Sequence, residues 1–168
     1  MEKKVIPFFL ISVFIIASGC VQEHKKDTQA EAENNSEPQL SVAQQKAELL
    51  QKGFEIFDYV DPKTADTVLM QQYFIAFLKR GANRSQNEKE ADSLQSLHLE
   101  HLGRMYELGY ADISGPFGDD GEIRGITIYN TPNIEMADSL ANLDPMVKAG
   151  RLSIEMHPWW AAKGFPLR

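Results

Sequence analysis

The sequence has little of what several functional classes require. Its 168 residues include one cysteine, Cys20, so no disulfide can form within the chain. Basic residues are also scarce: 17 Lys and Arg stand against 24 Asp and Glu, which leaves a formal net charge of −7. A nucleic-acid-binding surface neutralises phosphates with a basic run or patch, and beyond short pairs such as Lys79–Arg80 the sequence has none. We therefore expect no nucleic-acid partner.

Motifs for cofactors, metals and membrane-spanning helices are missing as well. The segment GPFGDDG lies between two expected strands, whereas a nucleotide-binding loop leads from a strand into a helix. His98, His101 and Asp144 could share a metal, but a closed zinc site takes four ligands and the single cysteine has another expected role. The apolar run from Val5 to Ala17 is shorter than the roughly 20 residues of a spanning helix. We expect no cofactor, no metal and no transmembrane anchor.

The N-terminal residues have instead the three parts of a secretory signal. Lys3 and Lys4 form a cationic start, an apolar stretch follows, and the small residues of IASGC lead to Cys20. IASGC resembles the lipobox of bacterial lipoproteins, in which the cysteine is lipidated and becomes the mature N-terminus, although Ala17 stands where Leu is usual. We expect a signal peptide at 1–19, a lipid on Cys20 that attaches the protein to a membrane, and a place in the bacterial cell envelope outside the cytoplasm. An ordinary signal peptide cut nearby is the alternative.

Composition divides the rest of the chain into three segments. Residues 20–40 are polar, with almost no large apolar side chain to offset the entropy of ordering, and they predict a disordered tether. Residues 41–67 predict an N-terminal extension, in which 41–52 form a short helix and the apolar stretch 54–60 packs on the domain. The domain itself is expected at 68–168.

Hydrophobic periodicity predicts three strands and a helix in the first part of this domain. The run 71–78 is apolar on both faces, which is typical of a strand buried on both sides. A helix at 91–108 is expected to end at Gly109, in the usual place for a left-handed cap. Two further strands, at 111–115 and 124–130, flank a segment rich in turn residues and predict a hairpin.

The second part of the domain predicts another helix and a last strand. Thr131 and Pro132 suit the N-cap and first position of a helix that ends near Leu143. Asp144 precedes a proline and suits the N-cap of a short helical turn. Alternating apolar residues predict a strand at 152–156. The order βαββαβ is ferredoxin-like, so the predicted fold class is α+β.

This order of elements has a consequence for assembly. Its two helices cover one face of the sheet, yet the first strand is apolar on the other face too, through Tyr73, Ile75 and Phe77. An exposed apolar patch of that kind is uncommon on soluble monomers. We expect the same face of a second copy to cover it, which predicts a homodimer. The pair Trp159–Trp160 is interpreted as part of the core or of an interface.

Several short motifs resemble the YCII-related (YciI-like) family over roughly residues 70–160. The first motif is a His eleven residues before a Gly, here His98 and Gly109. The second is the pair Gly-Pro after the second strand, here Gly115–Pro116. The third is Asp-Pro followed by Ala-Gly before the fourth strand, here Asp144–Pro145 and Ala149–Gly150. The resemblance implies a dimeric α+β barrel, in which two sheets pack face to face, and a His/Asp pair at the active site. It also implies a link to dehydrochlorination of a chlorinated aromatic ring, in which one class of relatives is implicated.

His98 and Asp144 are accordingly the candidate catalytic residues. His98 and His101 both fall within the apolar stripe of the predicted helix, where an imidazole is either a buried structural group or one that takes and gives a proton near neutral pH. The resemblance places Asp144 beside His98, where its carboxylate would orient the ring; capping the following helical turn is its structural alternative. His101 and Arg124 are candidate pocket-lining residues.

Two functions follow from these residues. The first is a small acid–base enzyme, with His98 and Asp144 acting on an unknown small, cyclic or aromatic molecule. The second is a non-catalytic envelope module that binds a small ligand or a protein partner. A pocket that opens onto His98 favours the enzyme, whereas a filled core around a neutral His98 favours the module. Lys79, Arg80 and Arg124 are cations able to hold an anionic substrate, although charged residues at strand ends are more often solvated.

Overall fold

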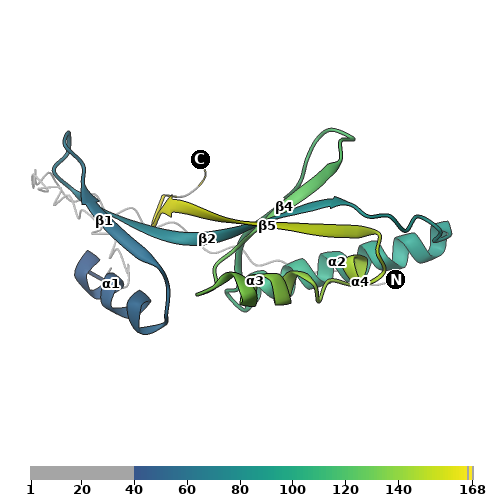
Figure 1. Cartoon of the computed structure of the whole chain (residues 1–168), viewed down its shortest axis with the longest axis horizontal. Coiled ribbons are helices and arrows are strands. Elements are labelled where there is room, and N and C mark those ends of the chain that lie inside the picture. The colour runs from purple at the N-terminus through teal and green to yellow at the C-terminus, as the bar shows by residue number, and fades with distance from the viewer. Residues whose placement is uncertain (1–39, 166, 168) are drawn as a thin grey trace, which may run out of the picture. The chain divides into compact units, whose positions relative to one another are not determined.

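A computed structural model describes residues 40–165 and 167 of the chain (Figure 1). The residues from Pro38 to Arg168 form one compact unit. The predicted signal peptide at 1–19, the lipidation site Cys20 and all but the last residue of the predicted tether lie outside the described residues. Over the described part of the chain, no helix is both long and apolar enough to cross a membrane.

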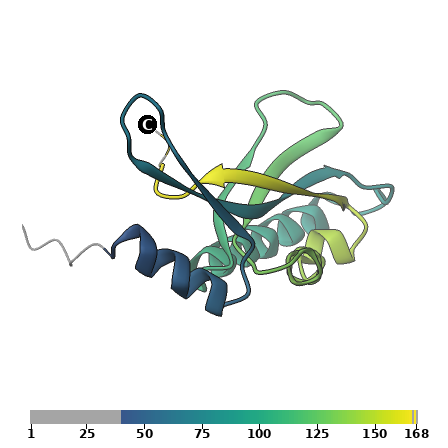
Figure 2. The same cartoon turned by 60° about the vertical axis from the view of Figure 1, so that its left-hand side comes forward.

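The described residues form five strands and four helices. In chain order these are α1 (Val42–Gln51), β1 (Ile56–Val60), β2 (Thr67–Arg80), α2 (Glu88–Glu107), β3 (Ala111–Pro116), β4 (Ile123–Tyr129), α3 (Ile134–Ala141), α4 (Pro145–Lys148) and β5 (Leu152–Ala162). In the sheet, β5, β2, β4 and β3 follow one another, and each neighbouring pair is antiparallel. Helices α2, α3 and α4 lie on one side of this sheet (Figure 1 and Figure 2). From β2 onward this is the predicted ferredoxin-like α+β arrangement.

The N-terminal extension contributes a helix and a strand to this unit. Ser41 and Gln44 form a capping box at the start of α1. Strand β1 pairs antiparallel with the first part of β2, from Ile56 opposite Gln71 to Val60 opposite Thr67. Because β5 pairs continuously along the other edge of β2, β1 and β4 share one edge of that strand, one after the other. The apolar residues predicted to pack on the domain therefore join its sheet.

Helix α2 begins earlier than its apolar periodicity predicts, because Asn87 starts a capping box. The Asn87 side chain accepts from the Glu90 backbone N–H at 3.0 Å, and the Glu90 carboxylate accepts from the Asn87 N–H at 3.1 Å. These bonds satisfy N–H groups that the first turn of a helix leaves without partners. At the other end Gly109 takes the left-handed conformation, with φ of 72°, as the sequence predicts.

The predicted start of the next helix is wrong. Asn133, rather than Thr131, is the N-cap of α3, since its side-chain oxygen accepts from the Met136 N–H at 2.9 Å. Thr131 is buried, and its hydroxyl donates to the Asn133 carbonyl at 3.1 Å. A hydroxyl already engaged in this way is not placed to cap, so the exposed amide of Asn133 does so.

The core lies between the sheet and the helices. Its buried cluster comprises Phe74, Ala76, Leu78, Met105, Ala111, Tyr129, Ala137, Ala141, Met146 and Leu152. Burial along β2 changes phase midway: the first part buries Leu69, Gln71 and Tyr73, and the second buries alternate residues from Phe74 to Leu78. Successive side chains of a strand point to opposite faces, so the two parts of β2 bury residues of opposite faces.

The buried side of α2 differs from the predicted apolar stripe. His98, His101 and Met105 are the buried residues of this helix, whereas Leu97 and Leu108 are 43% and 58% exposed. Spacings of three and four residues place the buried three on one side of a helix. The two histidines therefore occupy the middle of the side that packs on the domain.

The face of the sheet opposite these helices keeps apolar side chains at its surface. The ring of Tyr73 lies 6.3 Å from that of Trp159, which is 41% exposed. Phe77 is only partly buried, and Trp160 is 38% exposed. Within one chain, the strand predicted at 71–78 is therefore not buried on both sides. Both tryptophans are partly exposed, so neither is a core residue of the single chain, and their place in an interface stays a prediction.

Candidate active site

The candidate site centres on a hydrogen-bonded pair between His98 of α2 and Asp144, the residue before α4. The His98 Nδ1 and Asp144 Oδ2 atoms are 2.5 Å apart, within hydrogen-bond distance. The two side chains are 11% and 3% exposed. The fold thus brings together the two candidate catalytic residues, although they are 46 positions apart in the chain.

The two carboxylate oxygens of Asp144 have separate partners. Its Oδ1 atom accepts from the backbone N–H of Met146 at 2.8 Å and so caps the short helix α4. Its Oδ2 atom is the one that meets the ring of His98. The capping contact and the contact with His98, two roles of Asp144 that do not exclude each other, are therefore both present. The cap also fixes the direction in which the second oxygen points.

With Nδ1 engaged, the chemistry of His98 is left to Nε2. This atom has no hydrogen bond among the described residues, and it is not one of their buried unpartnered polar atoms. His98 lines a pocket of about 380 Å³, and Nε2 is the ring nitrogen that its bond to Asp144 leaves available there. An ionised carboxylate at Nδ1 keeps the proton on that nitrogen, which leaves the Nε2 lone pair free to accept a proton.

The walls of this pocket combine apolar and positively charged side chains. The apolar part is formed by Leu78, Leu99, Leu102, Ile126, Met146 and Leu152. Arg84, Arg124 and Arg151 also line the pocket. Small-molecule sites commonly have this composition, a mainly apolar wall with a few polar groups that fix orientation.

Of the three cations that the sequence suggests for an anionic substrate, Arg124 alone lines the pocket. Lys79 pairs instead with Glu155 at 2.9 Å. Arg80 Nη2 lies 3.1 Å from Asp120 Oδ1, an oxygen that Arg124 Nη1 also approaches at 2.6 Å. Arg124 is thus the candidate pocket residue that the structure places beside His98.

Sequence analysis missed two arginines of this pocket, Arg84 and Arg151. Arg84 follows β2 and Arg151 immediately precedes β5, and these strands are paired so that Arg80 lies opposite Leu152. The backbone N–H of Gly81 donates to the Arg151 carbonyl at 3.0 Å. In a βαββαβ unit the first and last strands pair antiparallel, so the segment after the first strand and the segment before the last lie at the same end of the sheet. The predicted order of elements could therefore have pointed to Arg84 and Arg151.

His101, the other candidate pocket-lining residue, lies outside the pocket of His98. It lines a separate hollow of about 170 Å³ with Arg104 and Leu143 among its neighbours. The two histidines lie on the same buried side of α2 but line different hollows. Over the described residues, no three His, Cys, Asp or Glu side chains are grouped as a metal site would need.

Two ionisable side chains near Asp144 are kept neutral by their surroundings. Burial lowers the pKa of His101, and the charge of Asp144 opposes this shift. Its Nε2 atom is buried without a hydrogen-bond partner among the described residues. Burial, followed by the charge of Asp144, raises the pKa of Tyr129. His101 therefore supplies no positive charge to balance the Asp144 carboxylate near neutral pH, and the ring of His98 is the bonded partner of that carboxylate.

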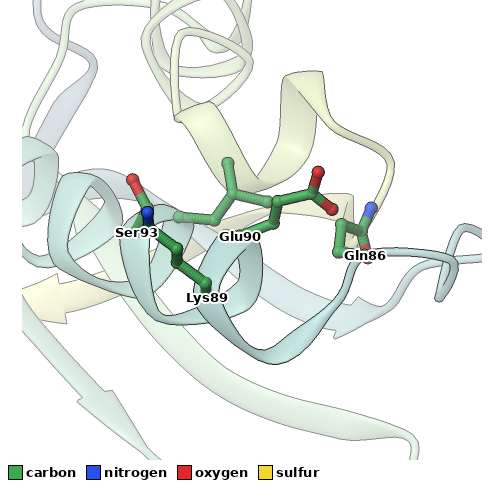
Figure 3. Close-up of a pocket in the computed structure, with 5 residues that line it drawn as sticks. Gln86, Lys89, Glu90 and Ser93 are labelled. Carbon is green, nitrogen blue, oxygen red and sulfur yellow. The ribbon is translucent and has the colours of Figure 1, made fainter.

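A larger hollow, of about 450 Å³, lies at the start of α2. It is lined by Gln86, Lys89, Glu90, Ser93 and Leu94, which come from the first turns of α2 and the residue just before its N-cap (Figure 3). Its lining therefore comes from one short segment of the chain, and it includes no histidine or cysteine. The smaller pocket beside His98 has the better claim to be the functional site, because its lining comes from several elements and includes a paired imidazole.

Comparison with known proteins finds a similarity among solved structures. No family model matches the chain. A search of curated proteins found no match. Among solved structures, the chain is similar to 5-chloro-2-hydroxyhydroquinone dehydrochlorinase from Burkholderia phenoliruptrix AC1100, whose structure is a complex with 2,5-dihydroxybenzoquinone. The two share 18% identity with a TM-score of 0.40, over 52% of this chain and 92% of that chain.

Proposed function

We propose that this protein is a small acid–base enzyme, in which His98 takes or gives a proton and Asp144 orients its ring. The observation that carries this proposal is the pairing of Nδ1 with Asp144 in a histidine that lines a pocket. The pocket volume of about 380 Å³ is near the lower end of the roughly 300–1,000 Å³ common for ligand sites. Its apolar wall favours a small substrate that contains a ring.

Proton transfer would use the Nε2 atom of His98. A substrate C–H or O–H placed against this atom gives its proton to the ring, and the Asp144 carboxylate stabilises the imidazolium that forms. The ring can then return the proton to another position of the substrate, which gives an isomerisation. It can instead give the proton to a departing group, which gives an elimination. Elimination is the class of reaction that the resemblance to the YCII-related family implies.

Exchange of substrate protons with solvent tests this role even when the product is unidentified. A panel of cyclic ketones and hydroxyquinols is incubated with the protein in heavy water and followed by NMR. At least one compound should exchange faster with the wild type, and His98→Gln should slow that exchange by about 100-fold or more, the contribution usual for a general base. His101→Gln is the matched control and should keep the activity. Equal exchange by wild type and His98→Gln contradicts the proposal.

A second candidate function is a non-catalytic envelope module that binds a small ligand or a protein partner. The observation that favours it is the exposed aromatic pair of Phe57 on β1 and Trp160 on β5, whose ring centroids are 5.0 Å apart. Solvent-exposed aromatic side chains are common in binding surfaces. Binding of panel compounds with no exchange in any of them would support the module over the enzyme.

We also propose that the chain belongs to the YCII-related family and forms its homodimer through the uncovered face of the sheet. The support is the apolar surface around Phe77 and Trp159, together with the family motifs. Residues 38–168, which form a compact unit, should sediment as a dimer. Phe77→Glu should give a monomer, whereas Leu108→Glu, at the exposed C-cap of α2, should not. A monomeric wild type at high micromolar concentration contradicts the dimer.

A lipid on Cys20 and a place in the bacterial cell envelope complete the proposed function. The support is the sequence motif IASGC after an apolar stretch. Each buried methylene contributes about 0.8 kcal/mol, so stable anchoring takes more than one acyl chain. Cys20→Ser should move the protein from the membrane fraction to the soluble fraction. An unmodified Cys20, or residues 1–19 still attached in mass spectra of the wild type, contradicts this.

A further inference from the structure

The pocket beside His98 carries more positive charge than a single proton transfer requires. Arg84, Arg124 and Arg151 line it, although the whole chain has a formal net charge of −7. Cations gathered in a cleft raise the local concentration of anions. A cluster of this sign on an acidic protein therefore points to an anionic ligand.

Neighbouring acidic side chains neutralise this charge only in part. The Oδ1 atom of Asp120 serves both Arg80, at 3.1 Å, and Arg124, at 2.6 Å. Arg151 donates to the neutral amide oxygen of Gln86 at 3.2 Å. Over residues 40–165 and 167, neither Arg84 nor Arg151 forms an ion pair. Two guanidinium groups at the pocket are thus left without a protein carboxylate.

The charges of the arginines act on one another. Arg84 is an exposed side chain whose pKa is lowered, first by desolvation and then by the positive charges of Arg151, Arg80 and Arg124, while the charge of Asp120 opposes this shift. Like charges close together repel, and a bound anion would relieve this repulsion. Arrangements of this kind are common at sites where the ligand is the counterion.

The segment that carries Arg84 is held in place by backbone hydrogen bonds. The Gly81 N–H donates to the Arg151 carbonyl and the Asn83 N–H to the Gly150 carbonyl, both at 3.0 Å. The Asn83 side chain donates to the Ala149 carbonyl at 2.9 Å. The loop after β2 is thereby fixed against the segment that leads into β5. A loop already ordered lowers the entropic cost of binding.

We propose that this pocket selects a small ring compound bearing a carboxylate, with Arg84 and Arg151 holding the carboxylate and the apolar wall holding the ring against His98. The planar guanidinium fork matches the two oxygens of a carboxylate. The apolar wall, with Leu99 and Leu102 of α2, suits the ring. The inference deepens the proposed function by naming its substrate class, and it relies on that function only for what His98 then does.

Binding of benzoate to the purified full-length protein tests this inference, with benzamide as the neutral probe of the same shape. Benzoate should bind about tenfold more tightly than benzamide, since charge-assisted hydrogen bonds are stronger than neutral ones. Two-dimensional NMR should show benzoate shifting the ring signals of His98. Arg84→Gln and Arg151→Gln should each weaken benzoate about tenfold and leave benzamide unchanged. Arg84→Lys, which keeps the charge but loses the fork, should fall between.

Three controls make the result decisive. Arg104→Gln removes an exposed arginine of the same helix as His98, outside the pocket, and should leave benzoate binding unchanged. Equal affinity for benzoate and benzamide, no binding of either, or equal weakening by Arg104→Gln overturns the inference. Tighter binding of phenylphosphonate than of benzoate overturns the choice of carboxylate. His98→Gln should still bind benzoate. A wild type that prefers benzoate but exchanges no proton of any panel compound refutes the proposed function alone. A wild type that exchanges protons without preferring benzoate refutes this inference alone.

Discussion

The change Asp144→Asn separates the two tasks of this residue. An asparagine can keep its Oδ1 on the Met146 N–H, because Asn and Asp are equally good N-caps. Its amide nitrogen then faces His98 Nδ1, where the wild type has a carboxylate oxygen. An amide donates, so Nδ1 must accept and the ring proton must move to Nε2. The variant should therefore keep the fold and lose the free lone pair that faces the pocket.

The expected energies follow from the contacts that each variant loses. Asp144→Asn exchanges a hydrogen bond to a charged group, worth about 1.5–3 kcal/mol, for a neutral one of about 0.5–1.5 kcal/mol, so the expected loss of stability is about 1 kcal/mol. Asp144→Ala loses the charged bond and also a helix cap of about 1 kcal/mol, so the expected loss is about 3 kcal/mol. The side chain is 3% exposed, so solvent does little to replace these bonds.

Two measurements check this reasoning. Urea unfolding gives the free energy of unfolding of each variant, with Asp138→Asn, an exposed acidic position on α3, as the control. Long-range proton–nitrogen NMR of the His98 ring shows which nitrogen carries the proton. Equal destabilisation by Asp144→Asn and Asp144→Ala would refute the capping role of Oδ1. A ring that keeps its proton on Nδ1 in Asp144→Asn would refute the role of Asp144 in setting the tautomer.

Three further predictions rest on other parts of the structure. Burial lowers the folded-state pKa of His101, so the unfolded chain binds the proton more readily and stability should fall as the pH drops below about 6.5. In urea unfolding, His101→Leu should lose less stability than the wild type between pH 7 and pH 5. A Cβ on Gly81 would lie 2.2 Å from the Gly150 carbonyl oxygen, so Gly81→Ala should lower the free energy of unfolding by about 1–3 kcal/mol and with it the melting temperature. Gly103→Ala, with open space around its Cβ in the helix, should raise the melting temperature. Burial raises the pKa of Tyr73 to about 12, so Tyr73→Phe should remove the tyrosine ionisation at the high-pH end of the ultraviolet titration of the folded protein. Loss of an ionisation near pH 10 instead would contradict this.

Local rules predicted many of the elements because their signals lie within a few residues. Gly109 ends α2 in the left-handed conformation, and Asp144 caps α4, since each effect depends on the nearest turn alone. The same rules failed at Thr131, whose hydroxyl is buried and bonded to the Asn133 carbonyl. The sequence does not show which of two good capping residues is engaged elsewhere.

The contacts of the candidate site depend on segments far apart in the chain. Sequence alone identified His98 and Asp144 as candidates, but their 2.5 Å contact spans 46 positions and requires α2 and α4 to pack on the same side of the sheet. Arg84 and Arg151 meet for a similar reason, because antiparallel pairing of β2 with β5 brings their flanking segments together. The apolar stripe predicted for α2 was shifted as well, since packing buries His101 and leaves Leu97 exposed. Residue type and spacing determined the elements, and the packing of distant elements decided which side chains share a pocket.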